Sequence, residues 1–201
     1  MTSRPLAEIV CVIDRSGSMN AIKSDAIGGF NSFLADQKKL DGSANLTLVL
    51  FDHEYDLLIN GVDINMVAPL TEDTYRPRGT TALLDAIGRT LDDLAQRLER
   101  TPQKKQPDQV MVAILTDGME NASCDYTRDR VFEKIQYLQK QRDWQFIFLA
   151  ANQDAIQTGA ELGIAHDRSV SFDSSGVGVK EAFSVLACMT AEVRGKVKKK
   201  K

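Results

Sequence analysis

The stretch AEIVCVIDRSGSMN, residues 7–20, contains the change of pattern that decides the fold. The run before Asp14 is apolar apart from Glu8, which is typical of a β-strand buried on both faces. Three oxygen-bearing side chains, Asp14, Ser16 and Ser18, then occupy alternate positions. Apolar residues at helical spacing follow them. The stretch therefore predicts a buried strand that leads through a polar turn into a helix.

The rest of the chain alternates strands and helices. Strands are expected at Ala7–Ile13, Asn45–Asp52, Glu54–Asn60, Gln109–Thr116, Trp144–Ala151 and Ser169–Phe172. Helices are expected at about Ala21–Leu40, Leu83–Leu98, Val131–Leu138, Ala155–Leu162 and from about Val177. The turn at His53 is too short for a parallel crossover, so the second and third strands are antiparallel. The pattern predicts an α/β fold: a doubly wound, mostly parallel six-stranded sheet with one antiparallel edge strand and helices on both faces.

The composition is that of a globular protein with a substantial core. The chain has 201 residues, of which 43% are hydrophobic and 26% are charged. It contains no linker long enough to divide it into two parts. We therefore expect a single domain over residues 1–193, followed by a basic, disordered tail, RGKVKKKK, at 194–201.

Charge and cysteine content limit the partners and the location. A formal net charge of -3 argues against nucleic-acid binding. The longest apolar runs are too short to span a membrane, and the first residues show no pattern of a secretion signal. The three cysteines are an odd, scattered set, which favours a reducing compartment. We therefore expect a cytoplasmic protein that binds neither nucleic acid nor membrane.

Three separated stretches place oxygen-bearing side chains at element boundaries: DRSGS at 14–18, RGTTALLDAIG at 78–88 and LTDG at 115–118. In an open parallel sheet these boundaries can meet in one crevice, outside the carboxyl ends of the strands. Carboxylates and hydroxyls with no His or Cys among them suit a hard cation such as Mg²⁺. Zinc is disfavoured, because the chain has only two histidines and no paired cysteines.

The three stretches resemble the metal-ion-dependent adhesion site (MIDAS) of von Willebrand factor type A (VWA) domains. The resemblance implies a site that binds Mg²⁺, with Mn²⁺ or Ca²⁺ as alternatives. It also implies that the hydroxyls bind the metal directly, that the carboxylates bind directly or through water, and that a sixth position stays open for a partner's carboxylate. The residues carried over are Asp14, Ser16, Ser18, Thr81 and Asp117.

Thr81 is assigned by its place relative to the following helix. The family pattern has an Ala-Ile or Ala-Leu pair five and six residues after the threonine, and Ala86 and Ile87 fit Thr81. Thr80 is the alternative. Taken singly, Ser18 or either threonine could instead cap a helix, and the Asp117–Gly118 pair could form only a turn.

The resemblance implies a binding module rather than an enzyme. The stretch DGMENAS at 117–123 is similar to a bacterial, cytoplasmic branch of the family, whose stand-alone members work with AAA+ ATPases or in stress systems. The alternative is a Mg²⁺-dependent phosphoryl-transfer or hydrolytic enzyme, but the chain lacks a phosphate-binding Gly-rich loop and an Asp-x-Asp pair after the first strand.

Loops around the site are expected to determine which partner binds. They are Met19–Lys23, Asp73–Arg78 and Met119–Asp125, and Arg76 and Arg78 would favour an acidic partner. Glu120 and Asn121 are expected either to support the ligands or to form the rim of the partner surface. Asp52 and Asp56 are expected to be hairpin-turn residues.

Overall fold

A computed structural model describes residues 5–151 and 154–195 of the chain. Its strands are β1 Leu6–Asp14, β2 Ser43–Phe51, β3 Tyr55–Asp63, β4 Gln109–Thr116, β5 Gln145–Ala151 and β6 Ser169–Phe172. Its α-helices are α1 Lys23–Lys39, α2 Leu83–Arg100, α3 Arg128–Arg142, α4 Ala155–Glu161 and α5 Gly176–Gly195. Its short 3₁₀ helices are η1 Gly17–Ile22, η2 Ile64–Met66, η3 Gln103–Lys105 and η4 His166–Arg168.

The six strands form one sheet in the order β3-β2-β1-β4-β5-β6. β3 pairs antiparallel with β2 at one edge, and every other neighbouring pair is parallel. The expected fold class is therefore confirmed. The strand order reverses between β1 and β4, which creates the position where open α/β sheets bind their ligands.

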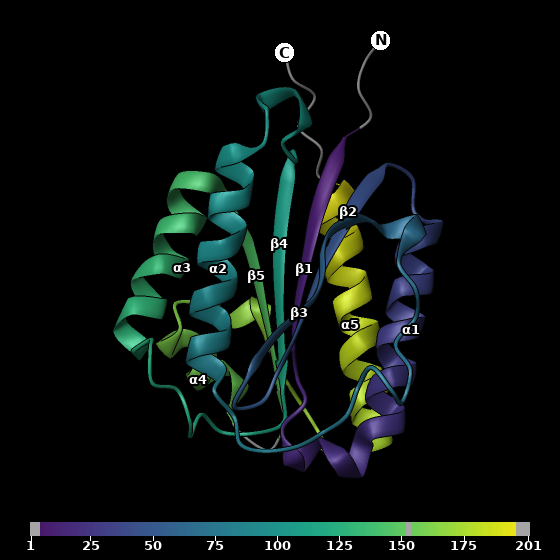
Figure 1. The fold of residues 1–201 in the computed structure, drawn as a ribbon, viewed down its shortest axis with the longest axis vertical. Coiled ribbons are helices and arrows are strands. Elements are labelled where there is room, and N and C mark those ends of the chain that lie inside the picture. Colours follow the sequence, from purple (N-terminus) through teal and green to yellow (C-terminus); the bar gives the residue numbers. More distant parts are fainter. Residues whose placement is uncertain (1–4, 152–153, 196–201) are drawn as a thin grey trace.

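Helices cover both faces of the sheet, as Figure 1 shows, with α1 and α5 on one side and α2 and α3 on the other. Alternate residues of β1 enter two separate cores, because successive strand side chains point to opposite faces. Ile9 packs with Phe30 and Phe183 of α1 and α5, whereas Val10 packs in the other core with Ile87 of α2. Burying each of these large side chains contributes roughly 1.5–3 kcal/mol.

Two expected boundaries differ in the structure. The helix expected to begin near Ala21 begins earlier, as the 3₁₀ helix η1, because the chain turns tightly after β1 to bury Met19. Arg194 and Gly195, which were expected in the basic tail, belong to α5. Arg194 is 9% exposed, and its guanidinium donates to the carbonyl oxygen of Gln37 at 2.6 Å. The remainder of the expected tail lies outside the described residues.

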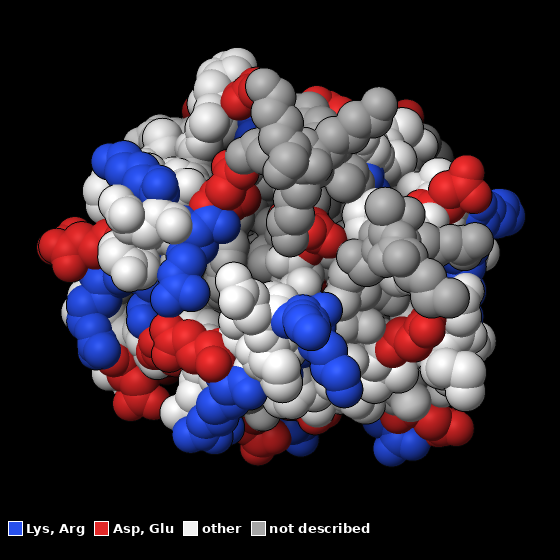
Figure 2. All heavy atoms as spheres, turned by 90° about the horizontal axis from the view of Figure 1, so that it is seen from above, with Lys and Arg blue, Asp and Glu red and all other residues white. Residues whose placement is uncertain are grey.

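The end of the molecule where the strands begin lies opposite the strand ends that carry the predicted site. Figure 2 views this end and shows basic and acidic side chains interspersed over it. In the described part of the chain, no helix combines the length and the apolar character needed to cross a membrane.

Candidate metal centre

Four of the predicted ligands lie together where β1 and β4 end. Asp14 is the last residue of β1, Ser16 and Ser18 lie in the turn and in η1, and Asp117 directly follows β4. The Ser18 hydroxyl donates to Asp117 Oδ1 at 2.6 Å, and the Oγ atoms of Ser16 and Ser18 are 3.1 Å apart. Ser18 is therefore not a simple helix cap, because its hydroxyl joins the first and third motifs.

The space beside Gly118 brings in the fifth predicted ligand. A side-chain carbon on Gly118 would lie 2.9 Å from Thr81 Oγ1 and 3.7 Å from both Asp14 Oδ2 and Ser16 Oγ. Glycine leaves this space free for oxygens that come from three different segments. The structure thus gathers all five predicted side chains in one place.

Both carboxyl groups of the cluster are held in surroundings that disfavour their charge. Burial raises the pKa of Asp14 to about 6, although hydrogen bonds from Thr116 and Ser16 partly offset it and the nearby charge of Asp117 adds to it. Burial also raises the pKa of Asp117, with the Ser18 hydrogen bond acting in the opposite direction. A cation placed between these carboxyl groups would reverse both effects, since an opposite charge favours the ionised form.

The donor set fits a hard divalent cation. Among the described residues, the polar contacts of Asp14 and Asp117 are to hydroxyls and backbone amides rather than to Lys or Arg side chains. No cluster of three or more His, Cys, Asp or Glu side chains occurs there either, so a metal at this site would depend on the hydroxyls. Oxygen-only sets of this kind suit Mg²⁺, Mn²⁺ or Ca²⁺ better than zinc.

Similar folds occur in solved structures, whereas no protein-family model and no curated protein matches the chain. The vWF domain of the type V pilus tip protein Mfa5 from Porphyromonas gingivalis matches 100% of this chain and 99% of its own, with 12% identity and a TM-score of 0.67. A mussel byssus protein, proximal thread matrix protein 1 with a zinc-occupied MIDAS motif, matches 94% of this chain with 18% identity and a TM-score of 0.62. The chain spans only 46% of that protein's length.

Manganese-loaded TRAP from Plasmodium vivax covers 72% of this chain and 56% of its own, with 23% identity and a TM-score of 0.50. Two of these structures hold a metal, zinc in one and manganese in the other. The chain has the VWA fold. At these identities the likeness establishes the fold, and the ligands of this chain rest on its own geometry.

Thr81 and Thr80 occupy different environments in this VWA fold. Thr81 is 3% exposed, and its hydroxyl faces Gly118, whereas Thr80 is exposed. The Thr81 amide donates to Asn121 Oδ1 at 2.9 Å, and the Asn121 amide donates back to the Thr81 carbonyl at 3.1 Å. Asn121 thus supports the Thr81 segment, which is one of the two roles expected for it.

Two side chains that the sequence did not identify hold Asp14 in place. The hydroxyl of Thr116, the last residue of β4, donates to Asp14 Oδ2 at 2.6 Å. The hydroxyl of the fully buried Tyr75 donates to the Asp14 carbonyl oxygen, also at 2.6 Å. Thr116 could have been found from its place beside Asp117 in LTDG. Tyr75 lies in an irregular loop, and nothing in the sequence pattern points to it.

Glu120 joins the loop after β4 to the start of α2. Its Oε2 accepts from the Leu84 amide at 2.9 Å, and its Oε1 accepts from the amides of Ala122 and Ser123. Asp85, in the first turn of α2, binds the same loop in the opposite direction. Its carboxylate accepts from the amides of Cys124, Asp125 and Tyr126. Glu120 therefore holds together the two segments that bear Thr81 and Asp117.

Asp52 lies in the β2–β3 turn, as expected, where its Oδ1 accepts from the Glu54 amide at 2.7 Å, and it also binds two arginines. Asp52 is fully buried, and its Oδ2 accepts from Nε of Arg15 at 3.0 Å and from Nε of Arg78 at 2.9 Å. Arg78 also pairs with Glu54, and Arg76 pairs with its near neighbour in the loop. The side chains of Arg76 and Arg78 are 70% and 50% exposed, so their attraction of an acidic partner stays a prediction. Asp52 holds a buried ion-pair cluster as well as the turn.

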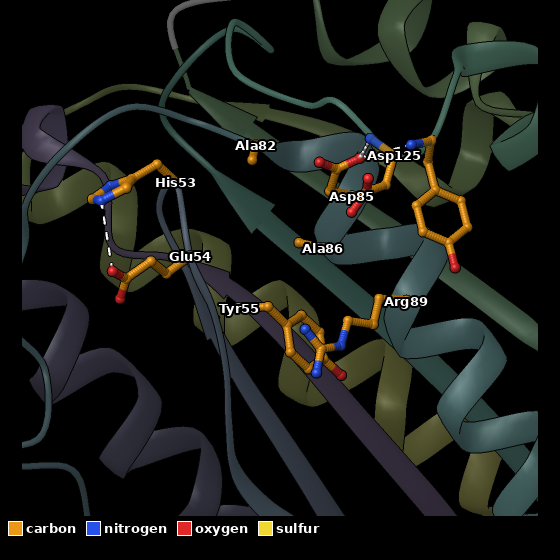
Figure 3. Close-up of a pocket in the computed structure, with 9 residues that line it drawn as sticks. His53, Glu54, Tyr55, Ala82, Asp85, Ala86, Arg89 and Asp125 are labelled. Carbon is orange, nitrogen blue, oxygen red and sulfur yellow. Dashed lines mark hydrogen bonds and ion pairs between the residues drawn. The ribbon is translucent and has the colours of Figure 1, made fainter.

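A cavity of about 460 Å³ lies on the β2–β3 side of the centre, next to Ala82. Figure 3 shows its mixed polar lining, in which the Arg89 guanidinium lies over the ring of Tyr55. The guanidinium carbon is 4.3 Å from the ring centroid. Asp85 and Asp125 contribute carboxyl groups to the same lining. This flank of the centre is therefore polar and charged.

Proposed function

We propose that the chain is a non-enzymatic, metal-dependent protein-interaction module. In this proposal, Asp14, Ser16, Ser18, Thr81 and Asp117 hold a Mg²⁺ ion, and a carboxylate of a partner protein completes its coordination. An under-coordinated hard cation in a partly buried site favours an anionic oxygen ligand. The function class of the VWA-fold structures named above, of which two hold a metal, supports an adhesion-type module in general terms.

The convergence of oxygen atoms from three distant segments carries this proposal. Thr81 Oγ1, Asp14 Oδ2 and Ser16 Oγ surround one point beside Gly118. The Ser18 hydroxyl, bonded to Asp117, keeps lone pairs for a metal, because a hydroxyl has one donor and two acceptor sites. Mg²⁺ is favoured over zinc since every donor is oxygen, and Mn²⁺ or Ca²⁺ would suit the same set.

The partner and the location follow from the resemblance and are part of the proposal. An AAA+ ATPase or a stress-system component of a bacterial cell would supply the carboxylate, and neither nucleic acid nor a membrane is involved. Cys124 and Cys188 are exposed free thiols, which suits the reducing cytoplasm.

Metal binding tests the proposal directly. Adding Mg²⁺ at 100 times its dissociation constant should raise the free energy of unfolding by about 2.7 kcal/mol, because only the folded chain gathers the ligands. We expect a higher melting temperature in Mg²⁺ than in EDTA, measured by calorimetry. The matched variant Asp14→Asn keeps the shape of the side chain but loses its charge, and its melting temperature should not respond. Equal shifts in both proteins would contradict the site.

Enzymatic activity is the competing outcome. Generic aryl phosphates should show no metal-dependent turnover with the wild-type chain, because the sequence lacks a phosphate-binding Gly-rich loop and an Asp-x-Asp pair after the first strand. Turnover that requires Mg²⁺ and is lost in Asp14→Asn would replace the binding module with a phosphoryl-transfer enzyme.

A further inference from the structure

A second cavity, of about 370 Å³, opens on the other side of the candidate centre. It lies between the first residues of α2, the loop after β4, and the helices α3 and α4. Leu83 in its lining is two positions after Thr81, and Met119 is two positions after Asp117. The cavity is therefore lined by the segments that follow two of the predicted metal ligands.

The charged side chains around this cavity already have partners within the chain. Glu120 accepts hydrogen bonds from the backbone of α2 and of its own loop. Arg128 pairs with Glu161. Asp154 caps α4 by accepting from the amides of its first turn. A ligand entering here would meet few polar groups that still need a partner.

The lining also contains two uncharged polar residues, Gln157 and Thr158, and four apolar ones. Leu83, Leu84 and Leu162 form buried apolar wall, and Met119 is 72% exposed beside them. An unbranched, polarisable methionine adapts to different apolar partners and is common at binding surfaces. In the cavity of Figure 3, by contrast, the aliphatic lining residues are two alanines, Ala82 and Ala86.

We propose that this cavity receives an apolar side chain of the same partner segment whose carboxylate binds the metal. The inference rests on the proposed function and adds the chemistry of the partner: an Asp or Glu with a Leu, Ile, Met or Phe at a fixed spacing within a few residues. Met119 contacts that side chain. The carboxylate supplies metal dependence, and the apolar side chain supplies selectivity among acidic segments.

Short displayed peptides with a fixed central Glu and random flanks provide the probe. They are selected on the wild-type protein in Mg²⁺ and eluted with EDTA. We expect enrichment of an apolar residue at one fixed position beside the Glu. The best peptide is then synthesised with its Glu changed to Gln and, separately, with its apolar residue changed to Ser. Fluorescence anisotropy gives the affinity of each peptide for wild type, Met119→Gln and the matched control Met66→Gln.

Met66 is a suitable control because it is 78% exposed and ends η2, which follows β3 at the opposite end of the sheet. Met119→Gln should weaken the best peptide about five- to tenfold, as expected when an apolar contact at an interface is lost, and Met66→Gln should not. Changing the peptide's apolar residue to Ser should lower its affinity for Met119→Gln less than it lowers its affinity for wild type. The reason is that the peptide change and the protein change remove the same contact.

The failures of the two proposals are distinguishable. Mg²⁺-dependent enrichment of Glu peptides with no apolar preference, or with a preference that Met119→Gln leaves intact, overturns this inference and leaves the proposed function standing. Selection that gives no EDTA-eluted peptides, or peptides that bind equally well with Gln in place of Glu, overturns both.

Discussion

Single hydroxyl groups set the geometry of the candidate centre. Thr116 Oγ1 donates to Asp14 Oδ2 and accepts from the Gly118 amide at 3.1 Å, so one side chain ties the first carboxylate to the turn that bears Asp117. Ser16 contributes its amide to Asp14 Oδ1 at 2.6 Å. With each oxygen of Asp14 held by one hydrogen bond, the carboxylate has a fixed direction before any metal arrives. Such support raises the affinity for a metal ion, because the carboxylate loses less conformational freedom when the metal binds.

Removing the Thr116 hydroxyl should therefore weaken metal binding without unfolding the chain. Thr116→Val keeps the volume of the side chain, and we expect a loss of roughly 10-fold or more in Mg²⁺ affinity, the usual effect of removing support from a metal ligand. Titration calorimetry measures the affinity, and Thr116→Ser, which keeps the hydroxyl, should restore most of it. If the Ser variant is as weak as the Val variant, packing at the end of β4 matters and the hydrogen bond does not.

The two neighbouring threonines allow an internal comparison. Thr81→Ala should abolish the Mg²⁺-induced rise in melting temperature, because its hydroxyl is the oxygen nearest the space beside Gly118. Thr80→Ala should leave that rise unchanged, since the Thr80 side chain is exposed. The same order should hold for capture of a partner. A larger effect at Thr80 would place the ligand one residue earlier.

The spacing of polar residues in the sequence was enough to predict which side chains lie together, whereas their binding of a metal stays a prediction. The alternation of Asp14, Ser16 and Ser18 is visible in the sequence, and the structure joins those residues to Asp117 through Ser18. Tyr75 could not be predicted, because its contact with the Asp14 carbonyl depends on how a long irregular loop folds back over β1. Met19 was expected on the partner surface, but it is buried, because a polar-looking loop can still turn one side chain inward.

At the scale of elements, an ion-pair cluster joins the β2–β3 hairpin to the turn after β1. Asp52 lies between Arg15 of that turn and Arg78 of the loop before α2. Backbone hydrogen bonds join the same segments. The Arg15 amide donates to the Phe51 carbonyl oxygen, and the Arg78 amide donates to the Arg15 carbonyl oxygen. The cluster thus positions the segments that lead to Ser16 and to Thr81.

Asp52 should make the stability of the chain depend on pH. Burial raises its pKa, but hydrogen bonds from the Glu54 amide and Arg78, with the charges of Arg15 and Arg78, outweigh this and hold the pKa below its ordinary value. The folded state therefore binds fewer protons than the unfolded state. The resulting stability is fully present above the unfolded pKa of about 3.9 and is lost as the pH falls through the lower folded value.

Asp52→Asn should accordingly cost up to about 3 kcal/mol at pH 7, because it removes the buried charge that Arg15 and Arg78 share and leaves the buried Arg15 only the half-exposed Asp56 as a charged partner. The difference from wild type should shrink below about pH 4, where the wild-type carboxylate also begins to protonate. Urea unfolding at both pH values measures it. Asp56→Asn is the matched control: Asp56 makes one contact with Arg15 and is half exposed, so we expect less than about 1 kcal/mol. A constant difference across pH would contradict the charge-based account.

The loop after β4 shows why element contacts were harder to predict than element positions. Glu120 and Asp85 each bind backbone amides of the other's segment, 36 to 41 residues away in the chain. Local sequence predicts a capping role only when donor and acceptor are a few residues apart. The partners of Glu120 depend on the sheet order, which brings the end of β4 against the start of α2.

For the whole molecule, the hydrophobic pattern was sufficient to predict the sheet. Continuous apolar strands can be buried only between two layers of helices, and the short turn at His53 permits only one antiparallel pair. Arg194 and Gly195 were expected in a basic tail, because they precede a run of lysines, but they belong to α5. In the structure the Arg194 guanidinium satisfies the carbonyl at the end of α1, which a composition argument cannot anticipate.

A buried ion pair lies far from the centre, near the start of β1. Glu8 is 1% exposed, and its Oε1 accepts from Arg97 of α2 at 2.5 Å and from Thr47 of β2 at 2.8 Å. Its Oε2 has no hydrogen-bond partner among the described residues. Six residues of strand, about 20 Å, separate Glu8 from Asp14. Changing this pair should therefore alter the stability of the chain but leave its metal affinity unchanged.

Arg97→Met should cost about 3–5 kcal/mol of stability, because it leaves the Glu8 carboxylate buried without its charged partner. The double variant Glu8→Leu/Arg97→Met removes both charges and should recover most of that loss, since apolar groups of similar volume can replace a buried ion pair. Urea unfolding measures both proteins in EDTA, and calorimetry measures Mg²⁺ affinity at a temperature where each is folded. Affinity should equal that of wild type in both variants. A double variant as unstable as the single one would show that Arg97 acts through the packing of its alkyl chain, and a change in Mg²⁺ affinity would show that the sheet transmits strain from its amino end to the candidate centre.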